Sequence, residues 1–144
     1  MIADGARIYL DTNVLIDLVE SSGQLSPAQA SILKDFDNGR LAAVTSEIAL
    51  AECLVRPLAD GNAMRVATFE ALLDGSGTPT MVPVDRKVLR LAAEARARDR
   101  MRLPDAIHVA TAIAEACNVF LSADRSIRVP DGLQLIDWQL PVAT

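Results

Sequence analysis

Aromatic residues, cysteine and histidine are scarce in this 144-residue chain. Aromatic side chains make up 3% of the sequence, and there are two cysteines and one histidine. Cys53 and Cys117 each fall inside a predicted helix and lack the spacing of metal ligands. Two such residues do not form the disulfide framework of small secreted domains. We therefore expect both to be free, buried thiols.

The chain also lacks a long apolar run. No run approaches the roughly 20 residues that a membrane span needs. Asp4 and Arg7 interrupt the amino terminus before a signal-peptide core could form. We therefore expect a cytoplasmic protein with no membrane partner. The 51% apolar content suits one packed domain without obvious room for a second, and we expect residues 1–144 to form a single domain.

Excess positive charge is missing overall but present locally. The net charge of −5 and the pI near 4.8 argue against a protein that holds nucleic acid by bulk charge. However, seven of the 14 Lys and Arg residues lie between Arg86 and Arg102. Four of them share one expected helical stripe with i, i+4 spacing: Arg86, Arg90, Arg98 and Arg102.

This basic stripe has two interpretations. A solvated helix face is the ordinary one for such a charge run. Contact with nucleic acid is the other, and it would involve Arg98 and Arg102, because these side chains stand just before the acidic motif at Asp105.

Apolar periodicity and helix-breaking residues predict an alternation of strands and helices. Ser26 and Pro27 are typical of a helix start, and Asp85 can cap the basic helix. Strands are expected at 7–11, 41–44, 80–84, 119–121 and 133–136. Helices are expected at 12–20, 27–38, from Thr45 or Ser46 to just before Pro57, 60–73, 86–100 and 103–116. This order predicts an α/β fold with a mainly parallel sheet of four to five strands, covered on both faces.

Asp11 is the most informative candidate for a functional residue. In IYLDTNVLI it follows a short apolar strand and precedes an apolar helical start. Such a position lies at the carboxyl edge of a sheet, where open α/β folds build their sites. Three more carboxylates have comparable settings: Glu52, Asp105 and Asp124.

Gathered carboxylates imply a cation. Several ionised acids within a few Å repel one another, and their oxygens favour Mg²⁺, with Mn²⁺ as a substitute. A bound divalent ion can activate water for attack on a phosphodiester and neutralise the developing charge. The acids therefore predict metal-assisted phosphodiester hydrolysis.

Each acid also has a purely structural interpretation. Asp11 could cap the first helix, and Asp105 could simply be a negative charge that the dipole of its helix favours in the first turn. Glu52 could pair with Arg56 on the helix surface. Asp124 could be a turn residue paired with Arg125.

His108 lies one turn after Asp105. A general base is one interpretation, and a packed or half-exposed histidine on an alanine-rich helix is the other.

Four motifs together carry a family resemblance. YLDTNVLI, the Glu in TSEIALAEC, LPDAIHVATA and the Asp in FLSADRS occur in the order and rough spacing of the PIN-domain ribonucleases. The chain resembles the VapC-type toxin of a VapBC toxin–antitoxin pair over nearly its whole length. The resemblance implies a three-layer α/β/α sandwich, Mg²⁺-dependent RNA cleavage, a homodimer and inhibition by a cognate VapB-type antitoxin.

The resemblance also assigns residues. Asn13 and Ser122 match the polar residues that support the first and last acids. Ala123 departs from the family, in which a polar residue often precedes the last acid. The catalytic quartet would be Asp11, Glu52, Asp105 and Asp124, with Asp11, Asp105 and Asp124 as metal ligands.

The sequence is compatible with several partners and with more than one function. An antitoxin could insert a cationic side chain among the carboxylates. A tRNA or another structured RNA is a plausible substrate. The alternatives are a PIN-domain nuclease of RNA processing that is no toxin, and an inactive scaffold that binds RNA or protein. A haloacid-dehalogenase-like phosphatase is disfavoured because it needs a second Asp where this chain has Asn13.

Overall fold

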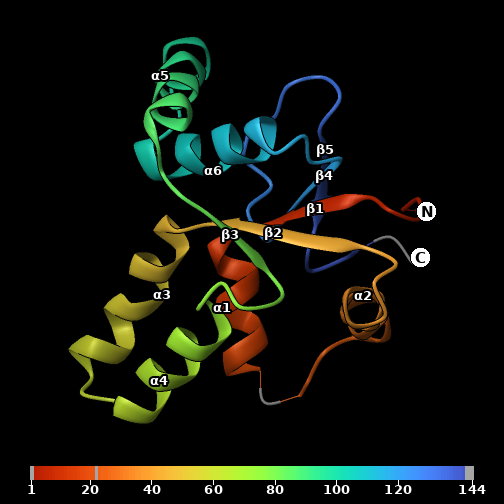
Figure 1. The fold of residues 1–144 in the computed structure, drawn as a ribbon, viewed down its shortest axis with the longest axis vertical. Coiled ribbons are helices and arrows are strands. Elements are labelled where there is room, and N and C mark those ends of the chain that lie inside the picture. Colours follow the sequence, from red (N-terminus) through yellow and green to blue (C-terminus); the bar gives the residue numbers. More distant parts are fainter. Residues whose placement is uncertain (1, 22, 142–144) are drawn as a thin grey trace.

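The computed structural model describes residues 2–21 and 23–141, in which a pair of helices follows each of the first three strands (Figure 1). Every predicted strand and helix is present, with ends that differ from the prediction by a few residues. In chain order the elements are β1 (Arg7–Leu10), α1 (Thr12–Glu20), α2 (Pro27–Asp37), β2 (Ala42–Ser46), α3 (Ile48–Ala59), α4 (Ala63–Leu72), β3 (Thr80–Val82), α5 (Arg86–Asp99), α6 (Leu103–Ala114), β4 (Val119–Ser122) and β5 (Gln134–Asp137).

The five strands form one parallel sheet in the order β3-β2-β1-β4-β5. The first strand is the central one: Ile8 lies beside Ala43 of β2 on one side and Val119 of β4 on the other. Because all strands run the same way, their carboxyl ends meet at one edge, which we call the carboxyl edge. Their starts meet at the opposite, amino edge.

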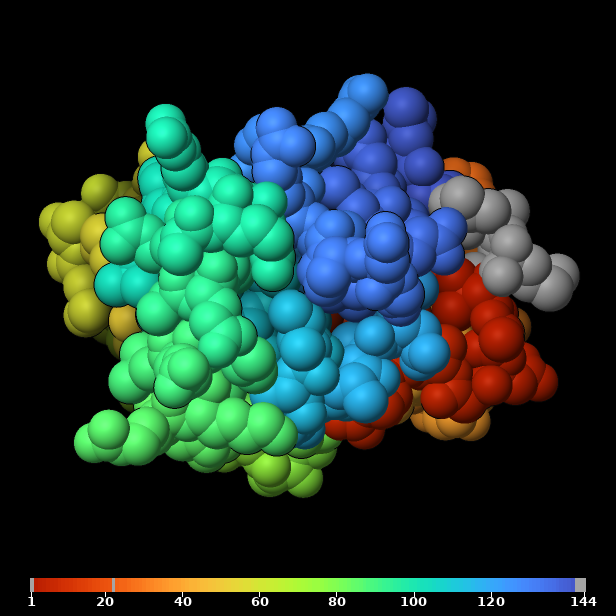
Figure 2. Space-filling model, turned by 90° about the horizontal axis from the view of Figure 1, so that it is seen from above, coloured from red at the N-terminus to blue at the C-terminus, as the bar shows by residue number. Residues whose placement is uncertain are grey.

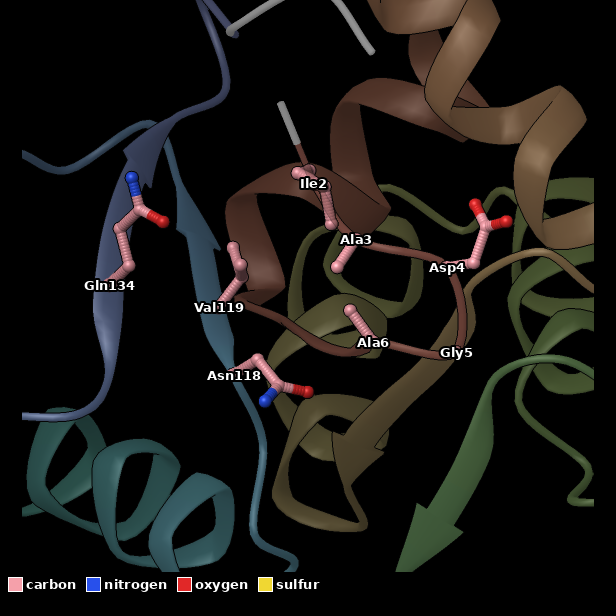
Figure 3. A pocket seen from close by; sticks show the side chains of 8 residues that line it. All are labelled: Ile2, Ala3, Asp4, Gly5, Ala6, Asn118, Val119 and Gln134. Atoms are coloured by element: carbon pink, nitrogen blue, oxygen red, sulfur yellow. The ribbon is translucent and has the colours of Figure 1, made fainter.

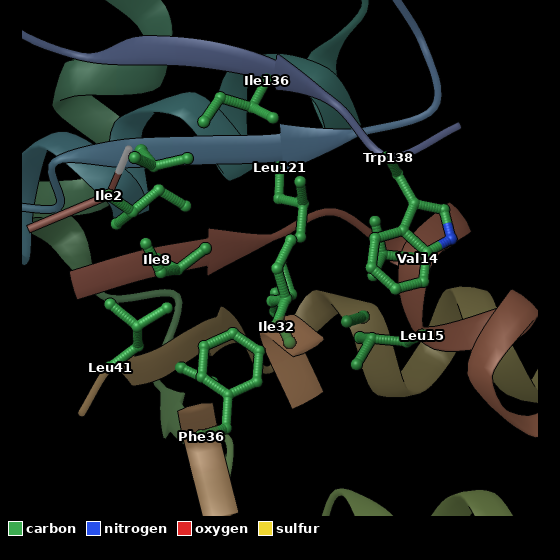
Figure 4. Close-up of a cluster of buried hydrophobic side chains, with 14 of the residues drawn as sticks. Ile2, Ile8, Val14, Leu15, Ile32, Phe36, Leu41, Leu121, Ile136 and Trp138 are labelled. Carbon is green, nitrogen blue, oxygen red and sulfur yellow. The ribbon is translucent and has the colours of Figure 1, made fainter. Parts of the chain in front are cut away.

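Side chains of each strand alternate between two hydrophobic cores. Ile8 and Leu10 of β1 pack with α1, α2, α3 and α4, whereas Tyr9 packs with α5 and α6 on the other face. Figure 4 shows the first core, in which Trp138 and Phe36 lie among aliphatic side chains. The sheet between two helical layers confirms the predicted three-layer α/β/α fold.

Local capping explains where two helices begin. Ser26 accepts a hydrogen bond from the backbone N–H of Gln29, whose side chain accepts one from the backbone N–H of Ser26. This capping box satisfies donors that the first helical turn leaves free. Asp85 accepts in the same way from Val88 at the start of α5. Both predicted helix starts are confirmed.

The predicted end of α3 before Pro57 is wrong. Pro57 lies inside α3, which ends at Ala59. Proline removes the backbone donor that would bond the carbonyl four residues earlier, but the helical hydrogen bonds continue past it, since the backbone N–H of Asp60 donates to the carbonyl of Arg56 at 2.9 Å. The buried Pro57 ring is therefore compatible with the last turn.

The predicted stripe of four arginines is also interrupted. Helix α5 ends at Asp99, and Arg100 adopts a left-handed conformation with φ of 56°. Arg102 therefore lies beyond that helix and is the N-cap residue of α6. The sequence has no Gly or Asn here, the usual signals for such an ending.

Two further expectations concern the thiols and the membrane. Cys53 and Cys117 are free and buried, as predicted. Cys53 lies in α3, but the prediction that Cys117 lies inside a helix is wrong, because α6 ends at Ala114. Burial raises the pKa of Cys53 to about 12 and that of Cys117 to about 11. None of the helices in the described part of the chain is long and apolar enough to cross a membrane.

Candidate functional site

Asp11 lies at the carboxyl edge, at the junction between β1 and α1. It is the N-cap residue of α1, and its side chain accepts a hydrogen bond from the backbone N–H of Thr12 at 2.8 Å. Its Oδ2 atom accepts a second one from the Ser122 hydroxyl at 2.7 Å. Only 5% of the residue is exposed. Burial raises the pKa of Asp11, while His108 and Ser122 partly oppose this. Asp11 therefore both caps a helix and carries a costly buried charge.

Asn13 links the first and last acidic motifs. Its Nδ2 atom donates to the Ser122 hydroxyl at 3.2 Å, and its Oδ1 atom accepts from the backbone N–H of Ala123 at 3.0 Å. The Ser122 hydroxyl also accepts from the backbone N–H of Asp124 at 2.9 Å. Since Asn13 contacts the backbone of residue 123, this link does not depend on the side chain there, where the sequence has alanine instead of a polar residue.

Glu52 reaches the same edge from α3. Its Oε1 atom accepts from the Thr12 hydroxyl at 2.7 Å and from Nε2 of His108 at 2.6 Å. Burial pushes the pKa of Glu52 up, but these hydrogen bonds outweigh it and keep the pKa below its ordinary value. Glu52 is therefore ionised at neutral pH. The alternative pairing with Arg56 is absent from the ion pairs of the described residues.

His108 is buried behind the acids rather than exposed beside them. It is 1% exposed, and its Nδ1 atom lies 2.6 Å from the hydroxyl oxygen of Tyr9, which is wholly buried. Burial raises the pKa of Tyr9 well above its ordinary value, so the phenol keeps its proton. We assign the imidazole proton to Nε2, because the ionised Glu52 that faces this atom can only accept, and Nδ1 then accepts a hydrogen bond from the Tyr9 hydroxyl. Tyr9, His108 and Glu52 form a continuous chain of hydrogen bonds.

This buried chain is the part of the site that sequence reasoning missed. The packed interpretation of His108 is correct, but its partners Tyr9 and Thr12 were not predicted as site residues. The sequence offered one signal for them, their closeness to the first acid: Thr12 directly follows Asp11, and Tyr9 lies two residues before Asp11 on the central strand. His108 also lies 3.8 Å from Oδ1 of Asp11.

Asp105 stands in the first turn of α6. Its Oδ2 atom forms an ion pair with Nε of Arg102 at 3.1 Å. The negative charge of Asp105 contributes to the raised pKa of Asp11, so the two carboxylates are electrostatically coupled. Arg102 is also coupled to Asp124 and Glu52. One guanidinium thus faces three of the four candidate acids.

Asp124 follows β4 in a tight turn. Its Oδ1 atom accepts from the Ser126 hydroxyl at 2.6 Å and from the Ser126 backbone N–H at 2.9 Å. These bonds lower the pKa of Asp124, and Arg102 adds to the effect. Arg125 pairs with Asp137 at 2.9 Å. The expected alternative, an ion pair between Asp124 and Arg125, is therefore replaced by this one.

The donor chemistry of the edge suits a hard divalent cation. Within residues 2–21 and 23–141, no three acidic, histidine or cysteine side chains stand close enough to hold a metal ion as they are. Mg²⁺, however, keeps several waters and is usually held by one or two carboxylates. Asp11 and Asp105, two coupled carboxylates, offer such oxygen ligands. The residues present fit Mg²⁺ or Mn²⁺ on these grounds.

Comparison with known proteins adds a family and a set of structural neighbours. The family model of the PIN domain matches residues 8–133. No curated protein matches the chain in sequence. The solved structures of three toxin or toxin–antitoxin systems are similar to this fold.

The first is VapBC2 from Rickettsia felis bound to promoter DNA, with a TM-score of 0.70 and 17% identity over 92% of this chain and 98% of that chain. The second is VapBC-5 from Mycobacterium tuberculosis, with a TM-score of 0.61 and 26% identity over 92% and 98%. The third is VapC20 from M. tuberculosis, a sarcin-ricin loop cleaving toxin, with a TM-score of 0.60 and 15% identity over 78% and 86%.

Proposed function

Because this chain belongs to the PIN domain family, we propose that it is a Mg²⁺-dependent endoribonuclease and the toxin of a type II toxin–antitoxin system. The observation that carries the proposal is the gathering of coupled carboxylates around the buried Asp11 at the carboxyl edge. A scaffold that only binds would gain nothing from this repulsion. Residues 1–144 then form a single PIN-like domain.

Asp11 and Asp105 would hold the cation, with Mn²⁺ as a substitute. The third predicted ligand, Asp124, would join them through a shift of its turn, since no three such side chains of the described residues stand close enough as they are. When bound, the ion would lower the pKa of a water molecule and neutralise charge on the phosphate. Asn13 and Ser122 would keep the first and last of these acids in place, through the hydrogen bonds between β1, α1 and the end of β4.

Glu52 would accept the proton of the attacking water. Its Oε1 atom is engaged by Thr12 and His108, whereas the hydrogen bonds of the described residues leave Oε2 without a partner. Oε2 is therefore the oxygen that can accept a proton. Because the pKa of Glu52 is held below its ordinary value, the base is in its ionised form at neutral pH.

RNA and an antitoxin are the proposed partners. The likeness to VapC20, described as a sarcin-ricin loop cleaving toxin, supports a structured RNA or a tRNA as the substrate. The likeness to VapBC-5, at 26% identity, supports a VapB-type antitoxin as the cognate inhibitor. We extend the proposal to a homodimer and to residence in the cytoplasm, as expected from the sequence.

Cleavage of total tRNA and of a structured RNA by the purified protein tests the nuclease. We expect cuts with Mg²⁺ or Mn²⁺, none with EDTA and none from an Asp11→Asn variant that remains folded. A folded wild-type protein that binds Mn²⁺ and RNA without cutting either RNA would favour the scaffold alternative. Growth arrest that a co-expressed neighbouring antitoxin relieves would separate a toxin from a nuclease of RNA processing.

A further inference from the structure

We propose that a cleft beside Asp105 binds the RNA phosphate next to the scissile one, through Arg100 and Arg128. The proposal rests on the proposed nuclease function and identifies a substrate contact of that site. It differs from the sequence prediction, which assigned RNA contact to Arg98 and Arg102.

The cleft opens directly onto one of the candidate acids. It has a volume of about 230 Å³ and lies between residues 99–102, Asp105 and residues 126–128. In Figure 2 the teal end of α5 and the blue loop after β4 lie side by side on one face. Pockets for whole organic ligands usually have roughly 300–1,000 Å³. A cleft of this size suits a phosphate group rather than an entire nucleoside.

Most arginines of the basic helix are already engaged. Arg90 pairs with Glu94 at 3.2 Å, and Arg98 pairs with Asp99 at 3.0 Å. Nε of Arg96 donates to the backbone carbonyl of Met101 at 2.9 Å. These side chains already have partners within the protein, which makes Arg98 a weaker candidate for RNA contact than the stripe suggested.

Arg100 and Arg128 differ from these arginines. Both are exposed, and neither has an ion-pair or hydrogen-bond partner for its side chain among the residues that the structure describes. Both line the cleft that contains Asp105. Unpaired guanidinium groups match the geometry of phosphate oxygens and can bind them bidentately. An RNA strand whose scissile phosphate lies at the acids would place its neighbouring phosphate here.

The backbone conformation of Arg100 determines which substitution tests its side chain. Its φ of 56° places it in the left-handed region, where glycine is the usual residue at the end of a helix. A residue with a Cβ atom is disfavoured there. The sequence therefore has a long cationic side chain where glycine would be the less strained choice, so replacing Arg100 by glycine removes the charge without straining the backbone.

Binding of fluorescently labelled tRNA, measured in EDTA over a range of salt concentrations, tests the proposal without cleavage. Arg100→Gly and Arg128→Gln should each weaken binding at low salt about 2- to 5-fold, the scale of an exposed ion pair. Each should also reduce the slope of log affinity against log salt by about 0.7. Arg90→Gln, which removes an equal charge from an engaged arginine, is the matched control and should change the slope less.

The thermal midpoint distinguishes a lost RNA contact from a destabilised fold. Arg100→Gly relieves the left-handed conformation, so its Tm should not fall below that of the wild type, although its RNA binding weakens. If both variants keep the salt dependence of the wild type, or if Arg90→Gln loses as much of it as they do, the cleft does not bind the phosphate. This holds even if the enzyme cuts RNA. A wild type that neither binds nor cuts RNA would overturn the proposed function together with the cleft.

Discussion

The two edges of the same parallel sheet differ in how their carboxylates are balanced by cations. At the amino edge, Arg7 pairs with Glu115 at 3.2 Å, and Arg40 pairs with both Asp4 and Asp35 at 2.8 Å. Every one of these carboxylates has a cation, and two of the three pairs, those of Arg7 with Glu115 and of Arg40 with Asp4, connect segments far apart in the chain. At the carboxyl edge, four carboxylates of the proposed site share one arginine and one buried histidine.

Pocket size does not distinguish the edges. Figure 3 shows a pocket of about 350 Å³ at the amino edge, lined by residues 2–6, Asn118, Val119 and Gln134. It is larger than the cleft beside Asp105. Its one carboxylate, Asp4, is neutralised by Arg40. Imbalance of charge, rather than hollow volume, therefore distinguishes the edge of the proposed site.

The strongest test of this comparison exchanges single acids for amides at each edge. Asp105→Asn or Glu52→Gln should reduce RNA cleavage by about 100-fold or more, because even residues that only position ligands contribute about 10- to 100-fold. Asp4→Asn, at the amino edge, should leave the rate unchanged. Single-turnover cleavage of the same RNA measures all three, and an equal loss in Asp4→Asn would refute the contrast.

The buried chain of hydrogen bonds behind the acids should matter next. His108→Gln should lower cleavage by about 10- to 100-fold, because Glu52 loses the donor that orients it. Tyr9→Phe should have a smaller effect on the rate and should reduce the free energy of unfolding by about 1–3 kcal/mol, since it leaves Nδ1 of His108 without its donor.

Arg40→Gln is the control for this buried chain. It removes two ion pairs at the amino edge and should lower Tm with no change in the cleavage rate. A rate loss in this variant equal to that in His108→Gln would mean that both edges act only through stability.

Asp11 should show a stability cost at neutral pH. Because burial raises its pKa above the ordinary value of 3.8, folding favours the protonated form. The ionised group therefore destabilises the fold at neutral pH. Asp11→Asn should raise Tm there, and the gain should shrink as the pH falls through the raised pKa towards 3.8. Thermal unfolding from pH 3 to pH 8 checks this, and a lower Tm at pH 7 would contradict it.

The two thiols provide the mildest comparison. Burial raises the pKa of Cys53 to about 12, and the nearby charges of Glu52 and Glu20 contribute. Burial raises that of Cys117 only to about 11, because Arg7 opposes it. The thiolate fraction at pH 9 should be larger for Cys117, which is also the more exposed of the two, at 8% against 2%. Cys117 should therefore be alkylated faster; the rates of the Cys53→Ser and Cys117→Ser variants measure this, and the opposite order would contradict the assignment of charge to the edges.

Local signals made most of the fold predictable. Ser26 with Pro27, and Asp85, mark helix starts by contacts within one turn, which sequence spacing reveals. The errors arose where such a signal misled or was missing. Pro57 was expected to end a helix in which it lies, and Arg100 ends one without glycine or asparagine.

The candidate site was predictable only in part. The positions of Asp11 and Asp124 after apolar strands indicated the edge at which they lie. The contact between Tyr9 and His108 joins residues 99 positions apart, so it depends on how α6 packs on the sheet. No periodicity in the sequence reports that packing. The pairing of individual arginines, which separates Arg98 from Arg100, was equally hidden.

The central position of β1 also determines when the proposed site can form during synthesis of the chain. β1 emerges first from the ribosome, yet its neighbour β4 begins 112 positions after the start of β1, at Val119. Asp11 receives its hydrogen bond from Ser122 only after 111 more residues have been added. A nascent chain that ends before β4 has the first acid but not its support. Assembly of the proposed nuclease is therefore delayed until most of the chain has been made.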